Sequence, residues 1–302
     1  MVDLECPSRR VTARWFCVAM VALVTQSLAQ PVTVSPRALV SFPSTVDGPN
    51  LESTGVPLAC ASGSLMVVVV SAGADPMNPK LQLGNRSIPV KVIGHDPVSR
   101  LEFISVEGVT LKAPEWADEV GASATASLQS LETGGPVMCR TTGWVKQVGG
   151  KVLPLALLQV SFSRSLPPPG TPLVDDSGRV VGIFFQSAAG ENTGYAIPAE
   201  AVHRVRQDIC NGGHLVRGWL GLALRADSRI PEISRVLPGS PALAAGIKPN
   251  DVLISIGDRE VTDYADAANA FFYLIPRQPV KVRLLRKAEP LEFTVTPVSP
   301  QG

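Results

Sequence analysis

The sequence predicts a mainly β protein, in which an all-β region is followed by a smaller domain of mixed α+β type. Between residues 37 and 197, short apolar or alternating runs such as ALVSF, LMVVVV and LEFISV are separated by Gly, Pro, Asn and Asp. This spacing is typical of a β-sandwich or barrel, and almost no helical periodicity interrupts it. Beyond residue 213 strand-like and helix-like runs alternate, which indicates the second domain.

The composition limits the classes of function. The chain has 302 residues, of which 45 % are hydrophobic and 18 % charged, enough for one or two cores and too apolar for disorder. Twenty-seven basic and 26 acidic residues give a net charge of +1, so charge does not indicate binding to nucleic acid or to an anionic membrane. The three histidines have no metal-ligand spacing, and we expect neither a metal nor a cofactor.

The first 29 residues have the pattern of a secretory signal peptide. Arg9, Arg10 and Arg14 precede the apolar run WFCVAMVALV, and small residues follow at Ser27 and Ala29. We expect cleavage after Ala29 and a secreted, periplasmic protein. A retained membrane anchor is the alternative, although ten apolar residues are fewer than the roughly 20 that span a bilayer.

Maturation would leave three cysteines, Cys60, Cys139 and Cys210. An odd, sparse set does not make a disulfide framework, so buried thiols are expected and a single bridge is the alternative.

Strands of the first domain are predicted from runs at 38–42, 65–70, 80–83, 88–94, 101–106, 123–128, 153–160 and 179–185. The triplet that begins at Asn85 is predicted to lie at a hairpin turn. A helix is predicted from 199 to 209, because Val202, Val205 and Ile209 recur at helical spacing and the following CNGG supplies a glycine stop.

The second domain combines strand-like runs with two helical segments, 240–246 and 263–274. Ser240 is suited to cap the first helix, Pro241 to its first position and Gly246 to its left-handed end. Asn250 suits the turn that follows. Predicted strands lie at 218–224, 232–237, 251–257, 280–286 and 291–298.

The strings LPGSPALAAGIKPNDVLISIGDREV and RGWLGL resemble a PDZ domain in the permuted order of bacterial PDZ modules. This resemblance implies that Leu220, Gly221 and Leu222 present backbone N–H groups to a peptide's terminal carboxylate. The strand through Leu224 would then pair with the peptide. Phe271 is either a pocket-lining side chain or a core residue.

With this segment attached, the strings KVIGHDPVSRLEFISV, LLQVSFSRSLPPPGTPLVDDSGRVVGI and GYAIPAEAV resemble the HtrA/Deg family of secreted trypsin-like serine proteases. The resemblance implies a trypsin-like double six-stranded β-barrel over residues 30–212, followed by a small α+β PDZ domain over 213–299.

Matching these strings to the family places Ser71, Arg100 and Pro169 where the family has its catalytic His, Asp and Ser. No histidine precedes His95, arginine inverts the charge that steadies an imidazolium, and proline has no nucleophile. The family's two oxyanion donors, the N–H groups of the serine and of the residue two before it, fall on Pro169 and Pro167, which have none. We therefore expect no catalytic residue. Arg100 is expected at the surface, solvated or ion-paired.

The prolines 167–169 favour a stiff polyproline-like loop that fills the former cleft. A relocated active site is the alternative, with His95 and Asp96 as base and one of four hydroxyls as nucleophile. These hydroxyls belong to Ser163, Ser165, Thr171 and Ser177.

The function predicted from the sequence is that of a secreted HtrA-like pseudoprotease. Its PDZ domain would bind peptide or protein C-termini, or extended segments, in binding or regulation of envelope protein quality control. The alternative is an active HtrA-like serine endopeptidase with a non-standard active site. A third hypothesis is a structural subunit, as a homotrimer or in co-assembly with active HtrA relatives.

Overall fold

The computed structural model describes residues 38–59, 65–106, 112–118, 126–132, 134–225 and 228–299. The predicted signal peptide and Cys60 lie outside these ranges, as does the first half of the predicted strand 123–128. Within them, no helix is both long and apolar enough for a membrane crossing.

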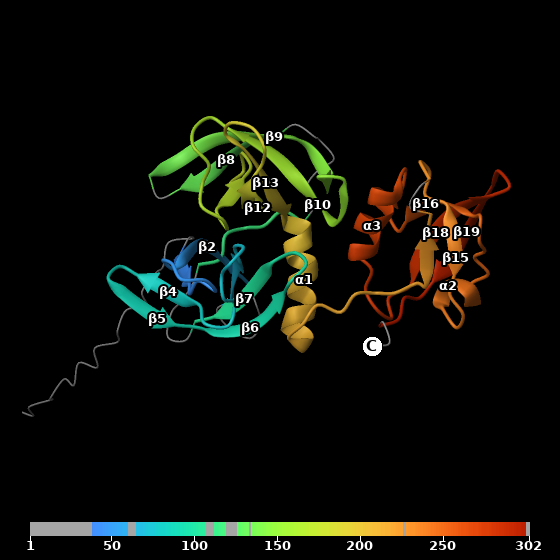
Figure 1. Cartoon of the computed structure of the whole chain (residues 1–302), viewed down its shortest axis with the longest axis horizontal. Coiled ribbons are helices and arrows are strands. Elements are labelled where there is room, and N and C mark those ends of the chain that lie inside the picture. The colour runs from blue at the N-terminus through green and yellow to red at the C-terminus, as the bar shows by residue number, and fades with distance from the viewer. Residues whose placement is uncertain are drawn as a thin grey trace, which may run out of the picture. The chain divides into compact units, whose positions relative to one another are not determined.

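Seven strands form one antiparallel sheet in the first part of the chain, drawn blue to teal in Figure 1. The resemblance implied a six-stranded barrel here and the apolar runs predicted five strands, but the structure has a seven-stranded sheet. The run 88–94 is divided, because Pro89 has no N–H with which to extend the ladder of edge strand β5, and β2 has no matching predicted run. Asn85 lies at the hairpin turn between β4 and β5, as predicted. The sheet has the order β5-β4-β1-β2-β3-β7-β6, with β1 (Ala38–Phe42), β2 (Leu51–Leu58), β3 (Leu65–Val69), β4 (Lys80–Leu83), β5 (Arg86–Pro89), β6 (Lys91–Asp96) and β7 (Leu101–Ser105).

The next six strands close into a barrel in the order β10-β13-β12-β11-β8-β9. Its long hairpin between β9 and β10 turns at Gly149 and Gly150, whose φ angles of 56° and 78° are those that a tight hairpin requires. The strands are β8 (Ser127–Glu132), β9 (Gly135–Val148), β10 (Lys151–Phe162), β11 (Pro172–Val174), β12 (Val180–Ser187) and β13 (Thr193–Pro198).

Helix α1 (Ala199–Gly212) follows the barrel and buries the face that the sequence predicted, with Val202, Val205 and Ile209 in one hydrophobic core. The same core holds Phe103 of β7 and Ile183 of β12, so it joins the two β regions and the helix. The helix ends where Gly213 adopts a left-handed φ of 74°. We placed the limit between the two domains at this point, and that limit stays a prediction.

The last part of the chain is the α+β region. Ser240 caps α2, its hydroxyl accepting from the Leu243 amide at 3.2 Å, and Gly246 has the predicted left-handed conformation with a φ of 87°. Helix α3 is shorter than predicted, since Asp263 is its cap and Pro276 follows closely. The elements are β14 (Leu222–Leu224), β15 (Ile233–Val236), α2 (Pro241–Ala244), β16 (Val252–Ile256), β17 (Arg259–Glu260), α3 (Tyr264–Phe272), β18 (Val280–Arg286) and β19 (Glu289–Val295).

Candidate functional site

A cavity of about 350 Å³ lies between the two β regions, and we call it the crevice cavity. Ser71, just after β3, Arg100, just before β7, and Pro169, in the loop between β10 and β11, all line it. The structure therefore brings together the three residues that the resemblance placed in the catalytic positions. The other lining residues are Ala72, Leu166, Pro167, Phe184, Phe185, Gln186 and Ser187.

Residues 167–171, in the loop beside the crevice cavity, have no free backbone N–H. Residues 167–169 are all proline, which has no amide hydrogen. The Gly170 amide donates to the Phe184 carbonyl at 2.7 Å, and the Thr171 amide to the Pro168 carbonyl at 3.3 Å. An oxyanion needs two donors that converge on it, and residues 167–171 offer none.

Hydrogen bonds from β2 fix this loop. The Pro169 carbonyl accepts from the Thr54 amide at 2.7 Å and from the Ser53 hydroxyl at 3.0 Å. Gly170, with a φ of 82°, passes so close that a Cβ there would lie 2.0 Å from the Thr54 carbonyl oxygen. These contacts hold the loop in place, but it forms a wall of the crevice cavity and does not fill it as we expected.

Arg100 lies in a different environment from the one that we expected. Its guanidinium carbon is 5.3 Å from the centre of the Phe185 ring, and the side chain is half-buried. Burial lowers the pKa of the guanidinium below its ordinary value. In the described part of the chain no carboxylate lies within 4 Å of it, so it is neither ion-paired nor fully solvated. Its backbone has a φ of 59°, and its carbonyl accepts from the Val70 amide at 2.9 Å.

The base proposed for a relocated site is engaged elsewhere. Asp96 accepts from the Ser99 amide at 2.9 Å and pairs with Arg217 at 3.3 Å, so it forms the predicted turn. His95 lies on β6, and its Nδ1 is 3.8 Å from Oε2 of Glu102. His95 is not among the residues that line the crevice cavity.

The four alternative nucleophiles are not placed for catalysis either. The Thr171 hydroxyl is buried and donates to the Pro168 carbonyl at 2.7 Å. The other three, Ser163, Ser165 and Ser177, are exposed and do not line the crevice cavity.

Glu102 is a buried acid that our sequence analysis missed. It is fully buried, and neither carboxylate oxygen has a hydrogen-bond partner among the described residues. Burial raises its pKa to about 8, with a further contribution from the charge of Asp75. Alternation along β7 was an available signal, because Glu102 shares its strand face with buried Ile104.

The segment that resembles a PDZ domain retains the geometry of a carboxylate loop. The amides of Leu220 and Gly221 donate to no backbone carbonyl of the described residues. Gly221 has a φ of 80°, and a Cβ there would lie 2.1 Å from Cβ of Ser240, so only glycine fits. Leu222, Leu224 and Phe271 are partly buried against the same core, which leaves both interpretations of Phe271 open.

Strand β14 has an open edge. It forms a two-stranded sheet with β15, and no described strand pairs with its other side. An extended peptide can add to such an edge through main-chain hydrogen bonds.

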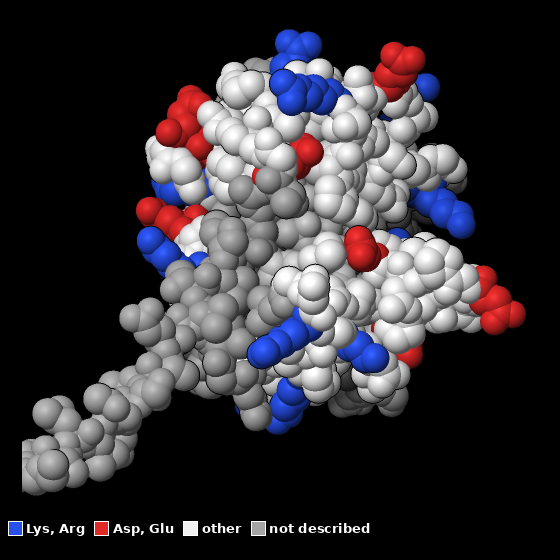
Figure 2. All heavy atoms as spheres, turned by 90° about the vertical axis from the view of Figure 1, so that its left-hand side faces the viewer, with Lys and Arg blue, Asp and Glu red and all other residues white. Residues whose placement is uncertain are grey.

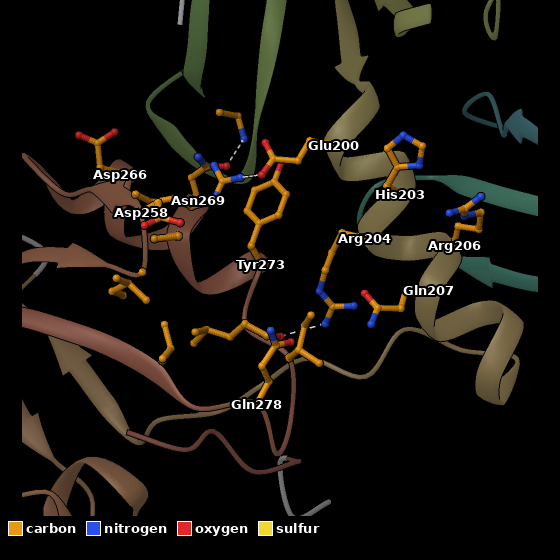
Figure 3. A pocket seen from close by; sticks show the side chains of 18 of the residues that line it. Glu200, His203, Arg204, Arg206, Gln207, Asp258, Asp266, Asn269, Tyr273 and Gln278 are labelled. Carbon is orange, nitrogen blue, oxygen red and sulfur yellow. Dashed lines mark hydrogen bonds and ion pairs between the residues drawn. The ribbon is translucent and has the colours of Figure 1, made fainter. Parts of the chain in front are cut away.

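A larger cavity of about 1140 Å³ lies beside α1 and α3 (Figure 3). Four of its charged side chains form two pairs: Arg259 with Glu200, and Lys146 with Asp266. Arg204 pairs with Asp208 at 2.6 Å and donates to the Leu274 carbonyl at 2.9 Å. These pairs hold neighbouring elements together, and we assign no reaction to this cavity.

The described residues include two of the three cysteines that were expected to be buried. Cys139 is buried, as expected, and burial raises its pKa to about 12. Cys210 is exposed, contrary to expectation, because it directly follows the buried face of α1 at Ile209.

On the face seen in Figure 2, basic and acidic side chains are interspersed. The described residues include no cluster that could hold a metal ion.

Comparisons with known proteins agree with this architecture. Residues 218–296 match the family model described as PDZ domain. The structure is similar to the HtrA-type protease AlgW with tripeptide, with a TM-score of 0.63 and 21 % identity over 89 % of this chain and 95 % of that one. The chain has the HtrA fold. The structure is also similar to a serine endoprotease from Yersinia pestis, with a TM-score of 0.55, 18 % identity and coverage of 88 % and 95 %.

Curated relatives extend the likeness to sequence. Putative protease Do-like 14 of Arabidopsis thaliana is 28 % identical over 63 % of this chain and 47 % of the relative. The periplasmic pH-dependent serine endoprotease DegQ of Escherichia coli is 25 % identical, over 70 % of this chain and 51 % of its own length. The chain thus spans about half the length of these relatives.

Proposed function

We propose that this HtrA-type chain is a pseudoprotease, in which a trypsin-like fold without hydrolytic activity is joined to a PDZ domain that binds peptides. The observation that carries this proposal is the loop 167–171, which has no free backbone N–H beside the crevice cavity. Its role would be binding or regulation in protein quality control of the cell envelope.

The catalytic groups that this chain lacks include backbone N–H donors as well as the three triad side chains. An enzyme that loses its triad can keep a roughly 10³- to 10⁴-fold acceleration through its oxyanion hole and substrate binding. Here Pro167 and Pro169 occupy the donor positions, so we expect that residual acceleration to be absent as well.

The peptide-binding half of the proposal is supported by the loop before β14. The free amides of Leu220 and Gly221 match the chemistry of a terminal carboxylate, and the open edge of β14 matches an extended chain. Leu222, Leu224 and Phe271 would contact the side chains of the peptide.

The location of the protein is proposed from the names of its relatives. Several relatives are named as periplasmic, which supports an extracytoplasmic location with the first 29 residues as its signal. A homotrimer, or co-assembly with active HtrA relatives, is the proposed state of assembly. Co-purification from native envelope followed by mass measurement tests it, and a monomer that binds peptides would contradict it.

Catalysis is tested by reacting the purified chain with a fluorophosphonate probe and by assaying casein hydrolysis. We expect no labelling and no turnover, while an active HtrA protease treated identically is labelled. Labelling that disappears when one serine is mutated would establish the alternative, an active endopeptidase.

Peptide binding is tested by titrating the whole chain with a library of free-carboxylate peptides and with the same peptides amidated. We expect binding of carboxylate peptides only, and loss of binding in Gly221→Ala. Gly239→Ala is the matched control, because Gly239 has a similar φ of 68° but a Cβ added there would have no atom within 4 Å. If the folded chain binds no carboxylate peptide, or binds amidated peptides equally well, the proposed recognition of a terminal carboxylate is wrong.

A further inference from the structure

We propose that the crevice cavity is a second ligand site, which binds one carboxylate attached to an apolar group, with Arg100 as the residue that recognises the carboxylate. This site is separate from the peptide-binding loop at Leu220 and Gly221, and it does not depend on whether that loop binds peptide.

The charge of the cavity comes from Arg100. No residue that lines the cavity is acidic. No described carboxylate lies within 4 Å of the Arg100 guanidinium. The nearby acid Asp96 is occupied by Arg217 and by the Ser99 amide. A half-buried cation without a counterion is costly, and an anion that enters the cavity removes that cost.

The geometry fixes where the anion would bind. The guanidinium is held against the Phe185 ring, and the Arg100 backbone is held by the bond from the Val70 amide. A planar guanidinium in a fixed position can donate two parallel hydrogen bonds to a carboxylate. The hydroxyls of Ser71 and Ser187 and the amide of Gln186 are further polar groups on the wall.

The rest of the wall determines what the carboxylate is attached to. Leu166, Pro167, Pro169, Phe184 and Phe185 present apolar surface, and the proline residues have no N–H to solvate a second polar group. A volume of about 350 Å³ is at the lower end of ligand pockets. The ligand class is therefore a small monocarboxylate, of the size of one capped hydrophobic amino acid.

The cavity is formed before any ligand binds. Its proline wall is fixed by the bonds from Thr54 and Ser53 to the Pro169 carbonyl and by the bond from Gly170 to Phe184. Binding would need little ordering of this loop, so the available contacts contribute to affinity.

Two sources can supply this chemistry, a free organic acid or the C-terminus of a polypeptide. The probes are N-acetylphenylalanine, its amide, and a short peptide that ends in phenylalanine. Each is titrated into the whole chain by calorimetry, and the peptide is titrated into Gly221→Ala to remove the PDZ loop. Equal affinity for N-acetylphenylalanine and the peptide indicates a free acid, whereas peptide binding tighter by about tenfold or more indicates a polypeptide terminus.

The variants test the role of Arg100. We expect Arg100→Gln to weaken binding of N-acetylphenylalanine by about tenfold or more, and Arg100→Lys to weaken it less, because charge remains but the planar fork is lost. Arg164→Gln is the matched control, because Arg164 is exposed in the same loop and does not line the cavity. Ser71→Leu keeps Arg100 but occupies the cavity, and should also abolish binding.

Several results would overturn the proposal. These are equal binding of the acid and its amide, unchanged affinity in folded Arg100→Gln, and no binding to the folded wild-type chain at millimolar concentration. Binding that is lost in Gly221→Ala but kept in Arg100→Gln would assign the ligand to the PDZ loop. If Arg100→Gln does not fold, Ser71→Leu decides the question.

Discussion

His95 and Glu102 face each other across the paired strands β6 and β7, with 3.8 Å between His95 Nδ1 and Glu102 Oε2. Glu102 is completely buried, and no group of the described residues forms a hydrogen bond with its oxygens. Burial lowers the pKa of His95 and raises that of Glu102, so both side chains are driven toward their neutral forms. The first β region therefore contains a carboxylic acid that keeps its proton near neutral pH.

This pair predicts how stability depends on pH. Between about 4.5 and about 8, folded Glu102 keeps a proton that the unfolded chain releases, so the free energy of unfolding falls as pH rises. Its contribution is at most about 1.4 kcal/mol per pH unit. The lowered pKa of His95 has the opposite effect. Below the ordinary pKa of histidine the unfolded chain takes up a proton that the folded chain resists, so this contribution to the free energy of unfolding rises with pH. Urea unfolding of Glu102→Gln against wild type isolates the Glu102 contribution.

We expect Glu102→Gln to gain stability relative to wild type as pH rises through this window. The control is Glu52→Gln, which removes an exposed carboxylate from β2. A stability difference for Glu102→Gln that does not change with pH would contradict the buried neutral acid.

The close approach of Gly170 to Thr54 makes a second prediction. Gly170→Ala should destabilise the chain more than Gly178→Ala, although the two glycines have similar φ angles of 82° and 80°. Both changes place alanine in the left-handed region at a cost of about 1–2 kcal/mol. Gly178 has open space around it, whereas at Gly170 the new Cβ would lie 2.0 Å from a carbonyl oxygen. We expect Gly170→Ala to lose about 2 kcal/mol more stability than Gly178→Ala, as measured by urea unfolding. An equal loss of stability in the two variants would mean that the loop moves away from Thr54 without cost.

Restoring the triad alone should not restore catalysis. The variant Ser71→His, Arg100→Asp, Pro169→Ser regains three side chains and one donor, but Pro167 still lacks an N–H. One missing oxyanion donor costs about 10²- to 10³-fold in rate. We expect the addition of Pro167→Gly to raise the rate of fluorophosphonate labelling by about that factor. Full labelling of the triple variant without Pro167→Gly would show that an N–H donor at position 167 is not needed.

The contact between Gly221 and Ser240 predicts a rescue. Gly221→Ala places a Cβ 2.1 Å from Ser240 Cβ, so it should destabilise the PDZ region. Ser240→Gly alone should cost only a few tenths of a kcal/mol, since glycine is a tolerable helix cap. In the double variant the cost of Gly221→Ala should fall by about 1 kcal/mol or more, as a double-mutant cycle by thermal unfolding measures. Additive costs would exclude the contact as the cause.

Some elements were predicted from sequence because local patterns determine them. Helix α1 buries the expected face, and α2 has the expected cap at Ser240 and left-handed end at Gly246. Strands with a continuous apolar run, such as β3, or an alternating run, such as β18, lie where we predicted them. In each case the signal lies within a few consecutive residues.

Other elements were missed because distant contacts determine them. Strand β2 contains Gly55 and Pro57, which locally indicate a break in a strand. Gly55 leaves room for Met66 of β3, whose sulfur would lie 2.1 Å from a Cβ built there. In strand β9, Pro136, Gly143 and charged residues interrupt the apolar residues, and the strand is paired along most of its length with β10.

The candidate site could likewise be predicted only in part, since its residues were identified from the sequence but their environment was not. The resemblance identified Ser71, Arg100 and Pro169, and the structure places all three on one cavity. The environment of Arg100 could not be predicted, since Phe185 is far from it in sequence and the absence of a counterion among the described residues is a property of the fold.

The run of three prolines beside the crevice cavity also determines which spectroscopic signals can report on it. Residues 167–169 carry no exchangeable amide proton, so this wall gives no signal in amide-detected spectra or in deuterium uptake. The aromatic ring protons of Phe184 and Phe185, which line the same cavity, remain observable. Selective isotope labelling of phenylalanine would therefore provide the direct reporter of occupancy in this protein.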